Sequence, residues 1–95
     1  MALGMIEVYG FTTSIVVSDA MAKAADVKVV AIDKTKPAGG DSAEVPLVMA
    51  IKVEGDASAV EAAIAKGKEE AEKRGLYITH KVIARLSALG KDKLR

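Results

Sequence analysis

Short apolar segments recur along the chain and predict four β-strands. The first, Ala2–Val8, is followed by Gly10, a natural turn residue. Further strands are predicted at Val27–Ile32, Leu47–Val53 and Tyr77–Ala84. The segment Lys34–Pro46 contains both prolines and the pair Gly39-Gly40, and it is the one clear loop in the pattern.

The clearest helix lies between the third and fourth strands. Its small and apolar residues recur at i, i+3, i+4, i+7 and i+11, the spacing of one helix face. They are Val60, Ala63, Ile64, Gly67 and Ala71. Asp56 is one candidate for the N-cap, while Ser58 and Glu61 have the spacing of a capping box. Gly75 is placed to end this helix.

A second helix is predicted over Phe11–Ala25, a segment with no glycine or proline. Its predicted apolar face consists of Ile15, Val16, Ala20, Met21 and Ala24. A short terminal helix is expected at Ser87–Leu94.

The predicted order of elements is β-α-β-β-α-β, which indicates an α+β domain of the ferredoxin-like kind. In this arrangement, strands two and three form an antiparallel hairpin, and two right-handed crossovers place both helices on one face of a four-stranded antiparallel sheet. The other face is left to solvent or to a partner. We expect one domain over residues 2–86 and a short tail over residues 87–95.

The composition favours assembly with partners. The chain has 95 residues, of which 51% are apolar but only 3% aromatic, and its mean hydropathy is +0.22. A chain this short buries only about 60–65% of the surface that its unfolded form exposes. The excess of small apolar side chains therefore suggests interfaces between subunits.

Charge and cysteine content exclude several classes of function. The absence of cysteine excludes a disulfide scaffold, a thiolate zinc site and an iron–sulfur cluster held by the chain's own thiolates. No apolar run reaches the roughly 20 residues of a membrane helix, and the start of the chain has no signal-peptide pattern, so we expect a cytoplasmic location and no membrane partner. The net charge of +1 is scattered along the chain, which argues against nucleic acid as a partner.

No catalytic constellation is present in the sequence. His80 is the only histidine, and we expect a partly buried strand residue with a hydrogen bond rather than a general base. Glu69, Glu70 and Glu72 are expected to form a solvated helix face. Acylphosphatases share this fold but use an arginine in the first loop and a nearby asparagine, both of which this chain lacks. The sequence therefore predicts no enzyme, no metal and no cofactor.

Three strings of residues are highly specific. They are the opening Ala2–Glu7 with Gly10-Phe11 and Ser18–Val27, then Val53–Ala63 followed by Gly67, and the closing Thr79–Arg85. Together they closely resemble bacterial microcompartment shell proteins of the single-domain, hexamer-forming class, and the resemblance covers about residues 2–86.

This resemblance implies a structural function. Such proteins form flat cyclic hexamers that tile into a polyhedral shell around the enzymes of a carboxysome or a metabolosome, with a central pore for small polar metabolites. The implied partners are further copies of the chain, other shell proteins, encapsulated enzymes and the permeating metabolites.

The resemblance also implies roles for three residues at the edge between hexamers. Lys23 matches the lysine that lies against its counterpart in the neighbouring hexamer, and Arg85 matches the arginine that fills a pocket near that lysine. Asp26 stands where the family often has a neutral amide, and its carboxylate could offset the crowded lysine charges. The alternative for Lys23 is an ordinary solvated helix lysine.

The implied pore loop departs most from the family, which usually has a very short turn after the hairpin lysine. Here a long segment separates Lys34 from Leu47, and the candidate pore residues are Lys34, Thr35, Lys36, Pro37, Ala38, Gly39, Gly40, Asp41, Ser42, Ala43 and Glu44. Any charge that faces a sixfold axis is repeated around the ring and sets the field in the pore. The alternative is an exposed hairpin loop with no role in transport.

A second class of function fits the same fold. A ferredoxin-like regulatory domain could pair into dimers or trimers and sense a small molecule at an interface. A specific ligand effect in the absence of hexamers would favour that hypothesis.

Overall fold

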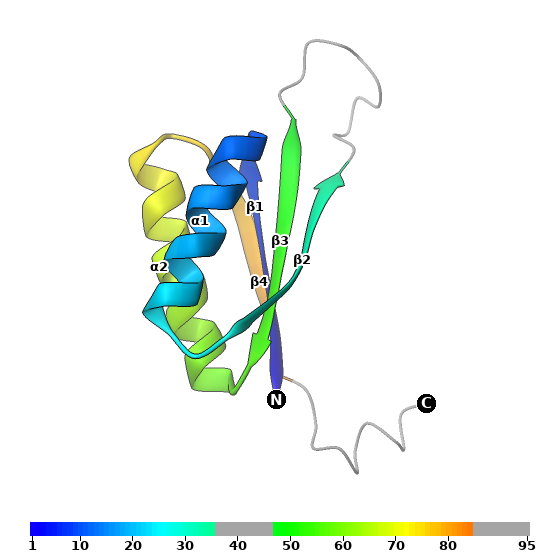
Figure 1. The fold of residues 1–95 in the computed structure, drawn as a ribbon, viewed down its shortest axis with the longest axis vertical. Coiled ribbons are helices and arrows are strands. Elements are labelled where there is room, and N and C mark those ends of the chain that lie inside the picture. Colours follow the sequence, from blue (N-terminus) through cyan, green and yellow to red (C-terminus); the bar gives the residue numbers. More distant parts are fainter. Residues whose placement is uncertain (36–46, 85–95) are drawn as a thin grey trace.

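The computed structural model describes residues 1–35 and 47–84 (Figure 1). The elements are β1 (Ala2–Tyr9), α1 (Phe11–Ala24), β2 (Lys28–Thr35), β3 (Val48–Gly55), α2 (Ala57–Lys73) and β4 (Tyr77–Ala84). The strands form one sheet in the order β2-β3-β1-β4, and every neighbouring pair is antiparallel. Both helices lie on one face of this sheet, so the predicted ferredoxin-like architecture is confirmed.

The alternation of β1 separates a helix-covered face from an open face. Ala2, Gly4, Ile6 and Val8 are buried, whereas the residues between them are half-buried. In β3, Ile51 pairs with Ile6 beneath the helices, while Lys52 pairs with Met5 on the open face. The core therefore lies between the helices and the sheet.

The predicted buried face of α2 is confirmed. Its buried residues are Val60, Ala63, Ile64, Gly67 and Ala71. Asp56 occupies the N-cap position, although its side chain makes no capping hydrogen bond. At the other end, Gly75 has a φ of +69°. The Gly75 amide donates to the Glu72 carbonyl and the Leu76 amide to the Ala71 carbonyl, which closes the helix in a Schellman motif.

The predicted apolar face of α1 is wrong, since Met21 is its only buried member. The buried residues of α1 are Thr13, Ser14, Val17, Ser18 and Met21. The Ser14 hydroxyl donates to the Phe11 carbonyl and the Ser18 hydroxyl to the Ile15 carbonyl, at 2.6 and 3.0 Å. Because these hydroxyls have partners within the helix, the small serines are buried at little cost and Ile15 is left exposed.

Strand boundaries also differ from the predicted ones. Lys34 and Thr35 were expected in the loop, but they extend β2 and pair with Met49 and Val48. Likewise, β3 begins at Val48 and continues through Gly55, because its last residues still pair with the start of β1. The predicted terminal helix at residues 87–94 lies outside the described residues.

Candidate functional site

The end of α1 presents a pair of opposite charges to solvent. Lys23 lies in the last turn of the helix, where a cation interacts favourably with the helix dipole. Its Nζ is 3.0 Å from Asp19 Oδ2, and the two side chains are 77% and 62% exposed. An ion pair this exposed contributes about 0.2–1 kcal/mol at most to stability. Both charges are therefore available to a partner.

Asp26 lies just beyond this helix end, in the bend that leads into β2. Its carbonyl oxygen would be 3.0 Å from a Cβ atom added to Gly55, so the glycine permits close approach of the two turns. Within the single chain, the residue paired with Lys23 is Asp19. The expected role of Asp26 concerns the contact with a neighbouring hexamer and stays a prediction. Sequence reasoning missed Asp19, although the i, i+4 spacing of an acid and a lysine on a helix was a usable signal. Arg85, the third predicted edge residue, lies outside the described residues.

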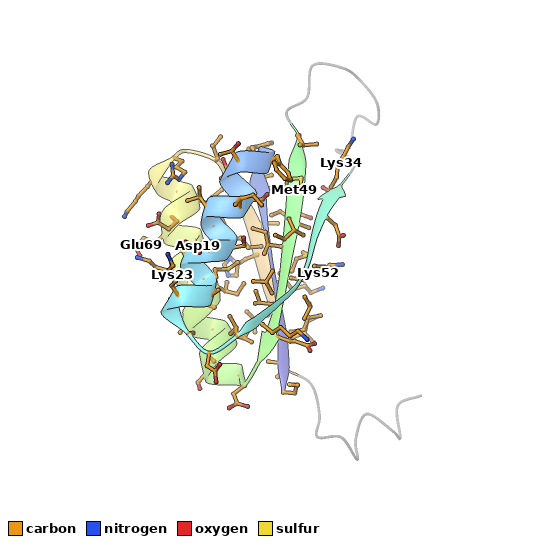
Figure 2. All side chains as sticks on the ribbon, viewed as in Figure 1. Asp19, Lys23, Lys34, Met49, Lys52 and Glu69 are labelled. Atoms are coloured by element: carbon orange, nitrogen blue, oxygen red, sulfur yellow. The ribbon has the colours of Figure 1, made fainter. Side chains whose placement is uncertain are left out.

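Two of the predicted pore residues are described. Lys34 is exposed at the end of β2, and the Thr35 hydroxyl donates to the Val48 carbonyl at 3.4 Å. The other candidates, Lys36 to Glu44, lie outside the described residues. Figure 2 places Lys34 near the end of β2 and Lys23 on the helix layer, so these two residues lie on separate surfaces.

The open face of the sheet carries a shallow hollow of about 230 Å³. It is lined by Leu3, Met5, Lys52, Lys81 and Ile83. Ile83 is 46% exposed, which is high for a large apolar side chain. Lys52 Nζ lies 3.7 Å from Asp33 Oδ2 on the neighbouring strand. This face therefore combines apolar area with a rim of lysines.

A second apolar surface lies at the start of α1. Phe11 and Ile15 are 58% and 45% exposed, and their i, i+4 spacing places them on the same side of the helix. The Gly10 amide donates to the Leu47 carbonyl at 2.7 Å, which holds this end of the helix against the start of β3. We call Phe11 and Ile15 the α1 apolar patch.

His80 is exposed, which corrects the prediction of a partly buried residue. The predicted hydrogen bond is present, since His80 Nδ1 and the Tyr77 hydroxyl oxygen are 2.6 Å apart. Lys68 Nζ lies 5.5 Å from the centre of the Tyr77 ring. Tyr77 thus contacts both Lys68 and His80, and His80 lines the same surface pocket as Glu61.

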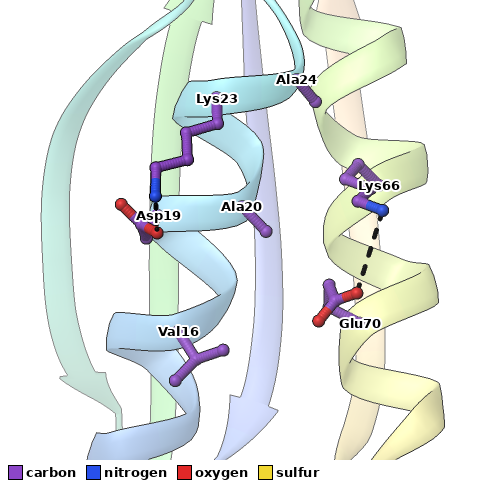
Figure 3. A pocket seen from close by; sticks show the side chains of 7 residues that line it. All are labelled: Val16, Asp19, Ala20, Lys23, Ala24, Lys66 and Glu70. Carbon is purple, nitrogen blue, oxygen red and sulfur yellow. Dashed lines mark ion pairs between the residues drawn. The ribbon is translucent and has the colours of Figure 1, made fainter.

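Two carboxylates of α2, Glu69 and Glu70, form ion pairs with lysines of the same helix, as Figure 3 shows for Glu70 and Lys66. Glu69 and Glu72 are exposed as expected, whereas the Glu70 side chain is only 17% exposed. Lys73 Nζ lies 3.1 Å from Glu70 Oε2, and this hydrogen bond, with the lysine charge, lowers the pKa of the Glu70 carboxyl. Among the described residues, no group of three or more His, Cys, Asp or Glu side chains could hold a metal ion. Within the same ranges, no helix has the length and apolar character to span a membrane.

Comparison with known proteins identifies the family. Residues 2–86 match the sequence model of the BMC domain. The chain belongs to the BMC domain family. The resemblance read from its sequence strings is thereby confirmed.

Curated relatives and a solved structure agree with this BMC membership. The bacterial microcompartment shell proteins PduK of Citrobacter freundii and Salmonella typhimurium are each 39% identical over 84 residues, which is 88% of this chain but 49% and 48% of theirs. The chain thus spans about half the length of these relatives. A microcompartment protein from Desulfitobacterium hafniense DCB, known from a crystal structure, has a TM-score of 0.73 and 30% identity over 96% of this chain and 47% of that one.

Proposed function

We propose that this BMC-domain chain is a structural, non-catalytic shell protein. In this proposal it forms cyclic hexamers, the hexamers tile with one another and with other shell proteins, and the resulting wall encloses enzymes in the cytoplasm. The match of residues 2–86 to the BMC domain carries the proposal. The same match favours the shell role over the alternative of a small-molecule-sensing regulatory domain.

The two apolar surfaces support a ring. A head-to-tail interface needs two different surfaces on each copy, and it closes into a ring when the rotation between copies is suitable. The α1 apolar patch and the hollow around Met5 and Ile83 are two such surfaces, on different elements. In the proposed hexamer each copy inserts Phe11 and Ile15 into the open sheet face of its neighbour.

The separation of Lys34 from Lys23 supports different roles for the two surfaces. In the proposed ring, Lys34 and the segment that follows it face the central pore, whereas Lys23, Asp26 and Arg85 face the neighbouring hexamer. One charge per subunit at the axis would be repeated six times. Lys34, Lys36, Asp41 and Glu44 together are formally neutral, so the side chain that faces the axis sets the sign of the field in the pore.

The mass of the assembly tests the ring. We expect native mass spectrometry or light scattering to give a particle near six times 9.9 kDa. A particle that remained a monomer at high concentration would contradict the proposed function. A dimer or trimer stabilised against heat by one metabolite of a panel would support the regulatory alternative instead.

The edge role of Lys23 has a separate test. Lys23→Ala is expected to leave hexamers intact and to abolish their growth into sheets, because the proposed contact lies between rings. Electron microscopy of the purified hexamers measures the sheets. Lys73→Ala is a matched control, since Lys73 is also an exposed last-turn lysine in an ion pair. If both variants formed sheets equally well, the proposed role of Lys23 at the edge between hexamers would be contradicted.

A further inference from the structure

The outer edge of β4 is available for pairing with a further strand. β4 is the last strand in the order β2-β3-β1-β4, and within residues 1–35 and 47–84 its partner is β1 alone. From Thr79 to Ala84 the two strands pair without a register shift, so the outward-facing backbone groups of β4 follow a regular ladder. The other edge strand, β2, has a register shift between Val29 and Ala31, which makes it a poorer template.

A hollow of about 400 Å³ lies beside this edge, at the seam between α2 and β4. It is lined by Glu61, Ile64, Ala65, Lys68, His80 and Val82, and we call it the α2–β4 hollow. The Tyr77 hydroxyl oxygen lies 2.6 Å from His80 Nδ1, and Lys68 Nζ lies 5.5 Å from the centre of the Tyr77 ring, so these polar side chains are held to one another. Ile64 and Val82 provide the apolar surface of the hollow.

A strand added to β4 would direct its side chains alternately to the two faces of the sheet. The α2–β4 hollow lies on the helix side, since Val82 pairs with Gly4 and the position of Gly4 is covered by α2. Lys81 lies on the open side, where it pairs with Met5. One set of added side chains would therefore meet an apolar hollow, and the other set would meet a cation.

The charges of this edge favour a partner that carries carboxylates. Lys81 lies in the middle of β4, and the strand has no acidic residue. If two copies of this chain paired through their β4 edges, with the same face of each sheet on the same side, their Lys81 side chains would lie opposite or diagonal to each other. Such a contact is destabilising because the charges are alike, so the edge disfavours a second copy.

We propose that β4 binds an extended segment of a partner protein by strand addition, with apolar side chains in the α2–β4 hollow and acidic side chains beside Lys81. The backbone of β4 supplies the hydrogen bonds, and the two faces supply the specificity. The backbone edge and the α2–β4 hollow belong to neither surface of the proposed ring, although Lys81 also lines the hollow on the open face. The inference thus goes beyond the proposed function and does not depend on it.

A synthetic peptide tests the charge preference of the edge. The probe is as long as β4, eight residues, alternates valine and glutamate, is capped at both ends and carries a fluorescent label. Fluorescence anisotropy should show saturable binding to the wild-type chain, and the same peptide with lysine in place of glutamate should not bind. Lys81→Glu should weaken binding of the glutamate peptide about tenfold or more and reverse the preference between the two peptides. Equal binding of both peptides to the wild-type chain would overturn the proposal.

Backbone methylation tests strand addition itself. In a strand, alternate residues direct their N–H and C=O groups toward the same neighbouring strand. One probe is therefore N-methylated at its valines and a second at its glutamates. Only one of the two sets of amides faces β4, so one methylated peptide should lose binding and the other should keep it. Equal behaviour of the two peptides would contradict strand addition, because binding would then not depend on one edge of the peptide backbone.

Filling the α2–β4 hollow tests where the apolar side chains lie. Ala65 is exposed on α2 and lines the hollow, so Ala65→Phe should occupy it without disturbing the core and should weaken peptide binding about tenfold. Ala62→Phe is the matched control, since Ala62 is exposed on the same helix but does not line the hollow, and binding should stay at the wild-type level. Circular dichroism confirms that both variants fold. If Ala65→Phe bound the peptide as well as the wild-type chain, the hollow would not be part of the site.

The peptide measurements and the ring can fail separately. If the wild-type chain formed no ring, the proposed function would fail, but the peptide titration would still test the edge of β4. If the wild-type chain formed hexamers that bound neither peptide, the β4 proposal would be overturned and the shell role would stand. Peptide binding that weakened as the protein concentration rose would also overturn it, because a second copy would then occupy the edge.

Discussion

Ile15→Asp is expected to convert the proposed hexamer into monomers. Ile15 is 45% exposed on α1 and contributes little to the core of the single chain, so the variant should fold. In the ring, the same substitution removes the burial of a large aliphatic side chain, about 1.5–3 kcal/mol, and adds the cost of desolvating a carboxylate. The loss is repeated at every interface of the ring. Native mass spectrometry and circular dichroism measure assembly and folding separately.

Two control variants accompany this prediction. Ile15→Val keeps the apolar contact and should keep the ring, whereas Ala62→Asp places a carboxylate at an exposed position of α2 and should also keep it. A ring that withstood Ile15→Asp would show that the α1 apolar patch is not between subunits. If Ala62→Asp alone produced monomers, the interface between subunits would include α2 instead.

The contrast between the two helices shows where sequence reasoning succeeds. The buried face of α2 was predicted residue by residue, because its inner residues are apolar or small and its outer residues are charged. The face of α1 was predicted wrongly, because Ile15 is exposed although it is large and apolar. The prediction treated the chain as a monomer, in which apolar helix residues face the core. In the proposed ring, some apolar residues of α1 face another copy. Ser14 and Ser18 take inner positions, where their hydroxyls donate to carbonyls of the same helix.

The candidate site could be predicted only in part, because side-chain and strand partners depend on parts of the chain that a local pattern does not include. The resemblance pointed to Lys23 and to Asp26, which differs from the family's usual residue. It did not point to Asp19, the residue that pairs with Lys23 within the chain. Lys34 and Thr35 were assigned to a loop because turn-forming residues follow them, yet pairing with Met49 and Val48 extends the strand. Pairing between strands depends on the partner strand, which a local pattern does not contain.

Two glycines in the core should respond differently to the addition of one methyl group. A Cβ on Gly4 would lie 2.7 Å from Val60 Cγ1 and 2.9 Å from Ile64 Cγ1. Both neighbours are β-branched and stiff, and they hold α2 against β1. Gly4→Ala should therefore lower the free energy of unfolding by about 1–3 kcal/mol, measured by urea denaturation.

Gly67→Ala is the matched comparison, because the same methyl group meets a different neighbour. Its Cβ would lie 2.7 Å from Met21 Sδ and 2.9 Å from Met21 Cγ, but an unbranched thioether can turn aside. The substitution also adds about 0.8–1.0 kcal/mol of helix propensity, so its net effect should be small. Both variants are best measured in the Ile15→Asp background, where ring formation does not add to the apparent stability. If both substitutions lowered the free energy of unfolding equally, the stiffness of the neighbouring side chains would not explain how closely α2 packs on the sheet.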